Sequence, residues 1–254
     1  MEKASRTGLI RGEETITDDL LLNIQSAHPS EVITCQFNKR EEGFTGADWE
    51  WWRTDGRLWY GLLIQAKRLN HKSHKYPEIQ RLVGKSARPQ IDVLIDQARL
   101  KGIDPLYFFY NYSSRNPAAF TWNCGHPFVL EQLGCTVAHA GAVEQLLGQG
   151  GVGLPKISPI SYPLRCLVCC PVLAESNDPL PRCAHGVAKR LRVFAQQDEV
   201  APGDFPAPVP KPPGYVLRLL HTAPEDRGGV IDELREQVGP IGSLVVIKDR
   251  REEK

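Results

Sequence analysis

Three polar side chains stand in two segments that are rich in apolar and aromatic residues. Asp48 lies within Gly46–Trp52, and Gln65 and Lys67 lie two positions apart within Leu58–Leu69. A carboxylate and an amide oxygen can hold a hard divalent cation. An ammonium group can stabilise charge on a phosphate or help to take a proton from water. The residue types therefore indicate metal-assisted phosphate chemistry, provided that the fold brings the three side chains together.

The connection between the two segments decides whether they share a face. Asp55-Gly56 is a strong signal for a two-residue hairpin turn. That turn would place Asp48 opposite Leu63. Gln65 would then be a diagonal neighbour of Asp48, at about 7–8 Å between α-carbons. Lys67 would share this face, because side chains two apart on a strand point the same way. The spacing suits one metal ion held between Asp48 and Gln65.

The same register predicts the surroundings of the site. Glu50 would lie opposite Gly61, whose missing side chain would leave room for Glu50 to act as a further ligand or a supporting group. The tryptophans of these segments suit packing in the sheet better than base stacking.

Two helices flank the expected strands. The segment 13–27 has apolar residues at helical spacing, ends before Pro29, and could take Thr15 or Thr17 as its N-cap. The segment 90–101 has the same spacing and stops at Gly102. Strands are expected at 31–38, 47–52, 58–69 and 105–112. The resulting order is helix, three strands, helix, strand, with a parallel crossover to the last strand.

This order, with Asp48 before the hairpin and Gln65-X-Lys67 after it, resembles the PD-(D/E)XK superfamily of nucleases, also called restriction-endonuclease-like. The resemblance covers roughly Glu13 to Tyr112. Gln65 replaces the acidic residue of the motif, as in the Mrr-like restriction branch and some nuclease effectors of bacterial antiphage systems. Ala47 stands where the family usually has proline.

The resemblance implies a metal-dependent deoxyribonuclease with a restriction-endonuclease-like αβββαβ core and a mixed sheet. Asp48 and Gln65 would bind Mg²⁺ or Mn²⁺, and Lys67 would act on water and phosphate. Glu14 would complete the site from the first helix, although the helix phase favours Glu13. In some related nucleases a glutamine on the second helix supports the site, and Gln90 has that position here.

The resemblance also suggests binding partners for the protein, and the sequence leaves one alternative function open. The expected substrate is double-stranded DNA, cut as part of a defence against phage or foreign DNA. Effectors of this kind often need a regulatory partner protein and often form homo-oligomers. Because Gln65 is neutral, the alternative is a catalytically degenerate module that binds nucleic acid or a partner protein.

A basic segment follows the motif. Residues 67–88 hold seven Lys or Arg and one acidic residue, although the whole chain has a net charge of only +1. A local cationic patch suits the nucleic-acid backbone, and a solvated loop is the alternative. The expected nucleic-acid contacts are Arg68, Lys72, Lys75, Arg81, Lys85 and Arg88.

Sequence patterns in the second half of the chain predict an extension of this core. Residues 1–113 would form the nuclease core, and residues 114–254 a C-terminal α/β extension that completes the sheet. Strands are expected at 215–222 and 243–249 with a helix between them. Residues 149–214, rich in Pro, Gly and Cys, would form an irregular insertion.

Cysteine spacing within this insertion suggests a structural zinc site. Cys166 and Cys169 are followed by Cys183 and His185, and three thiolates with an imidazole form a tetrahedral set for Zn²⁺. The alternative is reduced thiols packed as small apolar groups.

Composition excludes several classes of protein. The 254 residues are 41% hydrophobic and 24% charged, which is typical of a globular chain with a sizeable core. No apolar run is long enough to span a membrane, and the first residues lack the apolar stretch of a secretory signal. The expected location is therefore the cytoplasm.

Overall fold

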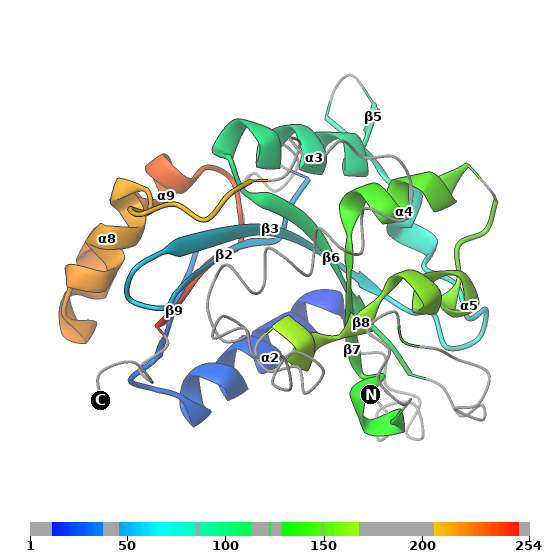
Figure 1. The fold of residues 1–254 in the computed structure, drawn as a ribbon, viewed down its shortest axis with the longest axis horizontal. Helices are drawn as coiled ribbons and strands as arrows, with labels where there is room; N and C mark the ends of the chain where they lie inside the picture. Colours follow the sequence, from blue (N-terminus) through cyan, green and yellow to red (C-terminus); the bar gives the residue numbers. More distant parts are fainter. Residues whose placement is uncertain are drawn as a thin grey trace.

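A seven-stranded mixed sheet forms the centre of the fold (Figure 1). The computed structural model describes residues 12–37, 46–84, 87–112, 122, 129–148, 150–167 and 206–248. The strands stand in the order β1-β9-β2-β3-β6-β7-β8. Their bounds are β1 Val32–Gln36, β2 Trp49–Thr54, β3 Trp59–Arg68, β6 Asp104–Tyr110, β7 Cys135–His139, β8 Tyr162–Pro163 and β9 Ser243–Lys248.

The last strand of the chain lies inside the sheet. β9 pairs in parallel with β2 and antiparallel with β1, so it separates the first two strands of the chain. On the other side of the hairpin, β3 pairs in parallel with β6, as the crossover through the second helix predicts. The α/β class and the mixed sheet are thus confirmed. β9, from the far end of the sequence, therefore lies in the same sheet as β3, which carries Gln65 and Lys67.

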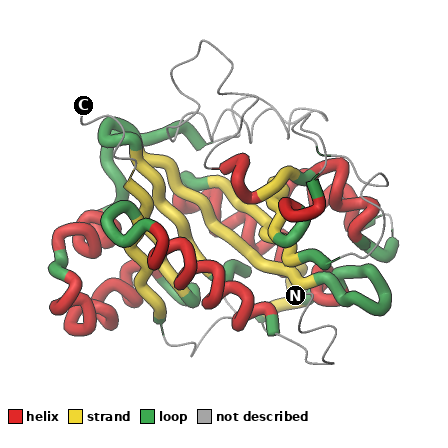
Figure 2. The backbone as a smooth tube through the Cα atoms, turned by 90° about the horizontal axis from the view of Figure 1, so that it is seen from below, coloured by secondary structure: helices red, strands yellow, loops and turns green. Residues whose placement is uncertain are grey.

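Helices cover both faces of this sheet. α2 (Glu13–Ala27) lies across the strands on one face (Figure 2). The other face is covered by α3 (Gln90–Lys101), α4 (Ala140–Leu147), α8 (Gly214–His221) and α9 (Arg227–Val238). Shorter elements are η1 Pro77–Gln80, β4 Leu82–Val83, β5 Arg88–Pro89, η3 Leu130–Gln132, α5 Leu154–Ile157, η4 Ser158–Ile160, η5 Leu164–Leu167 and η6 Pro224–Asp226. None of the helices in the described ranges has the length and apolarity needed to cross a membrane.

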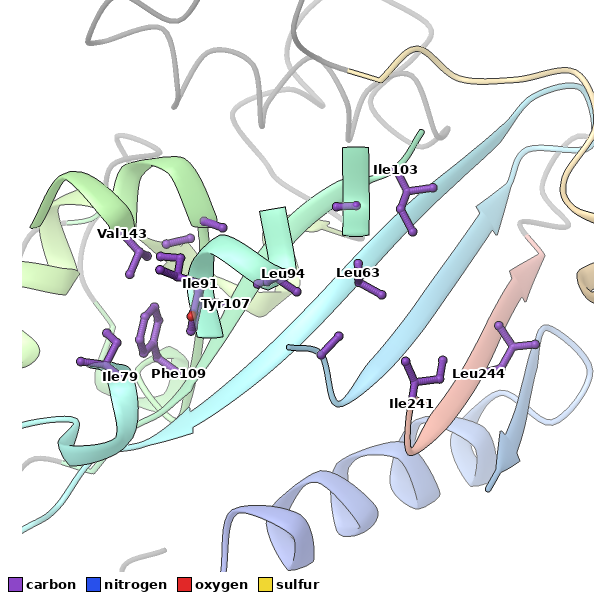
Figure 3. Close-up of a cluster of buried hydrophobic side chains, with 14 of the residues drawn as sticks. Leu63, Ile79, Ile91, Leu94, Ile103, Tyr107, Phe109, Val143, Ile241 and Leu244 are labelled. Atoms are coloured by element: carbon purple, nitrogen blue, oxygen red, sulfur yellow. The ribbon is translucent and has the colours of Figure 1, made fainter. Parts of the chain in front are cut away.

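Two apolar cores result from the alternation of side chains along the strands. Leu63 of β3 faces the helix α3, whereas its neighbours Leu62 and Ile64 face the side of α2. Ile91 and Leu94 of α3 lie over this face of the sheet, as Figure 3 shows. Burial on both faces explains why β3 is an almost continuous apolar run, in which Gln65, Lys67 and the terminal Arg68 are exceptions.

Two local predictions were wrong. Residues 215–222 were expected to form a strand, but residues 215–221 belong to the helix α8, whose Val216 and Leu219 are buried three positions apart on one helical face. Thr15 and Thr17 were expected as N-caps of the first helix, but Gly12 takes that position. The hydroxyl of Thr17 is used elsewhere, because it contacts the hydroxyl of Tyr110 at 2.8 Å.

Glu50 is a buried anchor between the sheet and the C-terminal helices. Its carboxylate is fully buried and lies 2.6 Å from the ammonium group of Lys101 on α3. It also accepts hydrogen bonds from the indole of Trp52 and the hydroxyl of Tyr215 on α8. Lys101 in turn donates to the carbonyl of Val238 on α9. Glu50 therefore joins β2, α3, α8 and α9, and these contacts give it a structural role.

We expect Glu50→Gln to lower the free energy of unfolding by about 3 kcal/mol, because it leaves Lys101 charged and half-enclosed without its carboxylate. Urea unfolding measures the effect. The control is Glu233→Gln, which breaks an exposed ion pair with Arg218 at 3.4 Å and should change stability by less than about 0.5 kcal/mol. Equal effects of the two variants would contradict the role of Glu50.

Candidate active site

The hairpin closes through four residues. Thr54 pairs with Trp59, so residues 55–58 connect the strands. Asp55 determines this turn, because its carboxylate accepts hydrogen bonds from the backbone N–H groups of Arg57 at 2.9 Å and Leu58 at 2.8 Å. The predicted two-residue turn at Asp55-Gly56 was therefore wrong. The ladder is shifted by two residues, and a shift by an even number leaves every side chain on its expected face.

The shift changes which residues are neighbours across the hairpin. The last pair of the ladder is Trp49 with Ile64, so Asp48 lies directly across from Gln65 instead of diagonally. Their side chains touch, since Gln65 Nε2 donates to Asp48 Oδ2 at 2.6 Å. The structure thus brings the predicted residue pair into direct contact.

The expected space beside Glu50 does not exist. Gly61 pairs with Trp52, and Glu50 pairs with Leu63. A β-carbon on Gly61 would lie 2.4 Å from Ile103 and 2.9 Å from the ring of Trp52. The glycine therefore makes room for the packing of an indole, and the neighbourhood of Glu50 is filled.

Two carboxylates lie along an edge of β3 that β2 leaves uncovered. β3 continues to Arg68, past the point where β2 begins. The N–H of Ala66 donates to Asp48 Oδ2 at 2.6 Å, and the N–H of Arg68 donates to Glu13 Oε2 at 2.8 Å. Alternate residues of a strand direct their N–H groups to the same side. In the part of the chain that the structure describes, this stretch of β3 thus holds two carboxylates side by side where β2 does not reach.

Glu13 is the helical carboxylate that joins this group. Burial is the main cause that raises the pKa of Glu13 from 4.5 to about 7, with Asp48 adding to the shift and Lys67 opposing it. The preferred residue, Glu14, is exposed one position further along α2. Glu13 and Glu14 both line a hollow that opens beside Asp48. The contacts at the edge of β3 therefore favour Glu13, the alternative indicated by helix phase.

Lys67 lies beneath α3 with only 2% of its surface exposed. Burial lowers the pKa of Lys67, and the negative charges of Glu13 and Asp48 act against that decrease. Its ammonium group donates to Gln90 Oε1 at 2.8 Å. An ammonium ion this deeply buried needs such partners. Arg81 and Glu78 also influence it electrostatically, which places part of the basic segment near the site.

Gln90 completes a chain of hydrogen bonds across the site. Gln90 Nε2 donates to Gln65 Oε1 at 2.7 Å, and Gln65 Nε2 donates to Asp48. We call the series Lys67–Gln90–Gln65–Asp48 the amide chain. Gly46 is a feature of the sequence that could have indicated the close approach of α3 to this site. A β-carbon on Gly46 would lie 2.6 Å from the carbonyl of Gln90, so only glycine lets the two segments approach this closely.

A hollow of about 190 Å³ opens beside the two carboxylates. It lies between the start of α2, the end of β1 and the start of β9. Its lining residues are Glu13, Glu14, Thr17, Asp18, Gln36, Phe37, Asp48, Gly242 and Ser243. The carboxylates in this wall make it suitable for a cation and unsuitable for a bare phosphate.

Metal binding at this site would need oxygens other than carboxylates. In the described ranges, no three His, Cys, Asp or Glu side chains lie together as a metal-binding group. Two carboxylates, the amide of Gln65 and the carbonyl of Ala66 are the nearby oxygen donors. The Ala66 carbonyl and Asp48 both accept hydrogen bonds from Gln65 Nε2.

The other predicted sites are described only in part. Cys166 is buried in the core on the side of α2, while Cys169, Cys183 and His185 lie outside the described residues. In the basic segment, Lys72, Lys75 and Arg81 are exposed, and Lys85 lies outside the described residues. Arg88 donates to Asp96 on α3 at 2.7 Å, which neutralises part of its charge.

Comparison with protein families gives one match. The model of DUF6615, described as a family of unknown function, matches residues 1–253. The chain belongs to this family. A comparison with curated proteins gave no match. The match spans both the hairpin and β9, so the DUF6615 region includes every strand of the sheet.

The raised pKa of Glu13 predicts a dependence of stability on pH. Between pH 4.5 and about 7 the folded state keeps a proton that the unfolded state has released, so stability falls as pH rises through this window. We expect a loss of about 2 kcal/mol in the presence of a chelator, measured by urea unfolding. Glu13→Gln should remove most of this slope, and Glu14→Gln should keep it. An unchanged slope in Glu13→Gln would refute this assignment.

Proposed function

We propose that this chain is a metal-dependent nuclease that hydrolyses phosphodiester bonds of DNA. One observation carries the proposal: Glu13, Asp48, Gln65 and Lys67 come from three separate segments and meet at one end of β3. Two carboxylates and a buried lysine at the end of an inner strand are a costly arrangement, because each charge loses solvation. Clustered groups with shifted pKa values are typical of functional sites.

The donor set fits Mg²⁺ or Mn²⁺. Glu13 and Asp48 would hold the ion together with oxygens of Gln65 and Ala66, and hard cations of this size prefer such oxygen ligands. Asp48 raises the pKa of Glu13, which shows repulsion between two neighbouring carboxylates that a cation would relieve. When bound, the ion would polarise the phosphate and make water more acidic.

The protein's own residues have distinct parts in this proposal. Glu13 and Asp48 would hold the ion beside the end of β3, and the ion would balance their negative charges. Lys67 stabilises the negative charge that develops on the phosphate, in a site where burial strengthens electrostatic interactions. Arg81 lies near enough to influence Lys67 and would neutralise an adjacent phosphate. The basic segment that carries Arg81 would then follow the DNA backbone.

The alternative function is a module that binds nucleic acid without cutting it. The observation that favours it is the direction of the Gln65 amide, whose nitrogen faces Asp48. A carboxylate at this position would add a negative ligand, whereas the amide adds none. The assay of Lys67 separates the two functions.

Lys67→Met should reduce cleavage of plasmid DNA at least 100-fold with Mg²⁺ or Mn²⁺, because it keeps the buried volume and removes the charge. Lys211→Met, which changes an exposed lysine ahead of α8, should cut as the wild type does. The catalytic proposal fails if the wild type does not cut under any condition and Lys67→Met binds DNA equally well. That result would support the binding module.

Arg81→Ala should weaken DNA binding and lower the slope of log affinity against log salt by about 1, since one phosphate contact is lost. Arg88→Ala should have a smaller effect, because Asp96 already neutralises part of its charge. Fluorescence anisotropy with duplex DNA, with Ca²⁺ in place of Mg²⁺, measures both. If Arg88→Ala lowers the slope as much as Arg81→Ala, the proposed path of the backbone is wrong.

A further inference from the structure

The two ends of the amide chain fix the direction of every hydrogen bond within it. An ammonium group can only donate and an ionised carboxylate can only accept. Lys67 therefore requires the oxygen of Gln90, and Asp48 requires the nitrogen of Gln65. The bond between the two amides then has one possible direction, from Gln90 Nε2 to Gln65 Oε1. Gln65 and Gln90 are buried, with 2% and 7% of their surfaces exposed, so water has little access to replace these bonds.

This direction is opposite to the one that a cation needs. The nitrogen of Gln65 faces the oxygens of Asp48 and Ala66, while its own oxygen faces Gln90. A cation that binds Asp48 and Gln65 must meet oxygen on both side chains. The amide of Gln65 must therefore turn over when the ion binds.

The reversal of the Gln65 amide forces changes along the rest of the amide chain. Once Gln65 has turned, its nitrogen faces the nitrogen of Gln90, and two donors cannot bond. Gln90 must turn as well, and its nitrogen then faces the ammonium group of Lys67. Lys67 loses the acceptor that holds it beneath α3 and must find another one.

We propose that the amide chain couples cation binding to the release of Lys67, with Gln90 as the positioning residue that transmits the change. The inference rests on the proposed function. Without an ion, Gln90 holds the ammonium group of Lys67. With an ion bound, the reversed amides free Lys67 to meet a phosphate. Because coupling between two binding events is reciprocal, a phosphate that draws Lys67 away from Gln90 should also tighten cation binding.

The direct test is an NMR titration of the intact protein with Mg²⁺ alone. The side-chain NH₂ signals of Gln65 and Gln90, assigned by substitution, should both move, although Gln90 is not expected to touch the ion. The backbone N–H signals of Ala66 and Arg68 report occupancy of the site. The side-chain signal of Gln25, whose oxygen accepts from the N–H of Thr34, is an internal control and should stay in place.

The possible results separate this inference from the proposed function. Movement of Ala66, Arg68, Gln65 and Gln90 together supports the coupling. If Ala66 and Arg68 respond while Gln90 does not, the ion binds without reversing the chain, and only the coupling is overturned. If no signal at the site moves at saturating Mg²⁺, the metal-dependent function falls, and the coupling falls with it.

Gln90→Met supplies a second measurement. Methionine keeps the length of the side chain but cannot hold Lys67 or orient Gln65. Without the bonds that resist reversal, the variant should bind Mg²⁺ on the order of fivefold more tightly than the wild type in calorimetry. The gain in DNA affinity that the wild type shows on adding Ca²⁺ should shrink in the variant, with thermal unfolding as the check that it folds. Unchanged or weaker Mg²⁺ binding by folded Gln90→Met would overturn the inference.

Discussion

The burial of the Lys67 ammonium group constrains the whole end of the sheet around it. A charge with almost no contact with water needs hydrogen-bond acceptors and opposite charge nearby. Gln90 supplies the acceptor at 2.8 Å, and Glu13 and Asp48 supply the negative charge. These three residues come from α3, α2 and the segment before β2. The position of one lysine therefore depends on elements from both faces of the sheet.

The ion pair between Glu50 and Lys101 is a buried arrangement of charges that has a structural role. Glu50 and Lys101 lie 2.6 Å apart, and Trp52, Tyr215 and Val238 satisfy their remaining polar atoms. The Glu50 carboxylate is fully buried and its bonding capacity is used, so it fixes the helices to the sheet. Glu13 and Asp48 instead line an open hollow, where a ligand can reach them. Access from solvent, more than charge, distinguishes the candidate site from the structural pair.

The amide chain links the electrostatics of the site to its packing. Its middle members are neutral glutamines. Each of them accepts one hydrogen bond and donates the next, so the orientation of one amide determines the orientation of the other. Gln90 is held at the start of α3, where Gly46 lies against its backbone. Packing between Gly46 and α3 therefore sets how closely Gln90 approaches Gln65. A glutamine at position 65, which first suggests a weakened site, becomes the connection between Asp48 and Lys67.

The sequence alone determined the features that depend on short-range patterns. The spacing of apolar residues predicted α2 and α3, and Gly102 marked the end of α3 correctly. The hairpin pattern placed Asp48 on the same face as Gln65 and Lys67, and this placement survived an error in the register because the error was an even number of residues. Such patterns suffice because they depend on backbone geometry within a few residues.

Tertiary structure decided the features that depend on distant partners. The carboxylate of Asp55 lengthened the turn, and the unpaired N–H of Arg68 bound Glu13. β9 entered between β1 and β2 from the far end of the chain, and no local pattern indicates that position. Residues 215–221 became a helix because Val216 and Leu219 could be buried together against the sheet. In each case the deciding bond or contact joins groups whose proximity exists only in the folded chain.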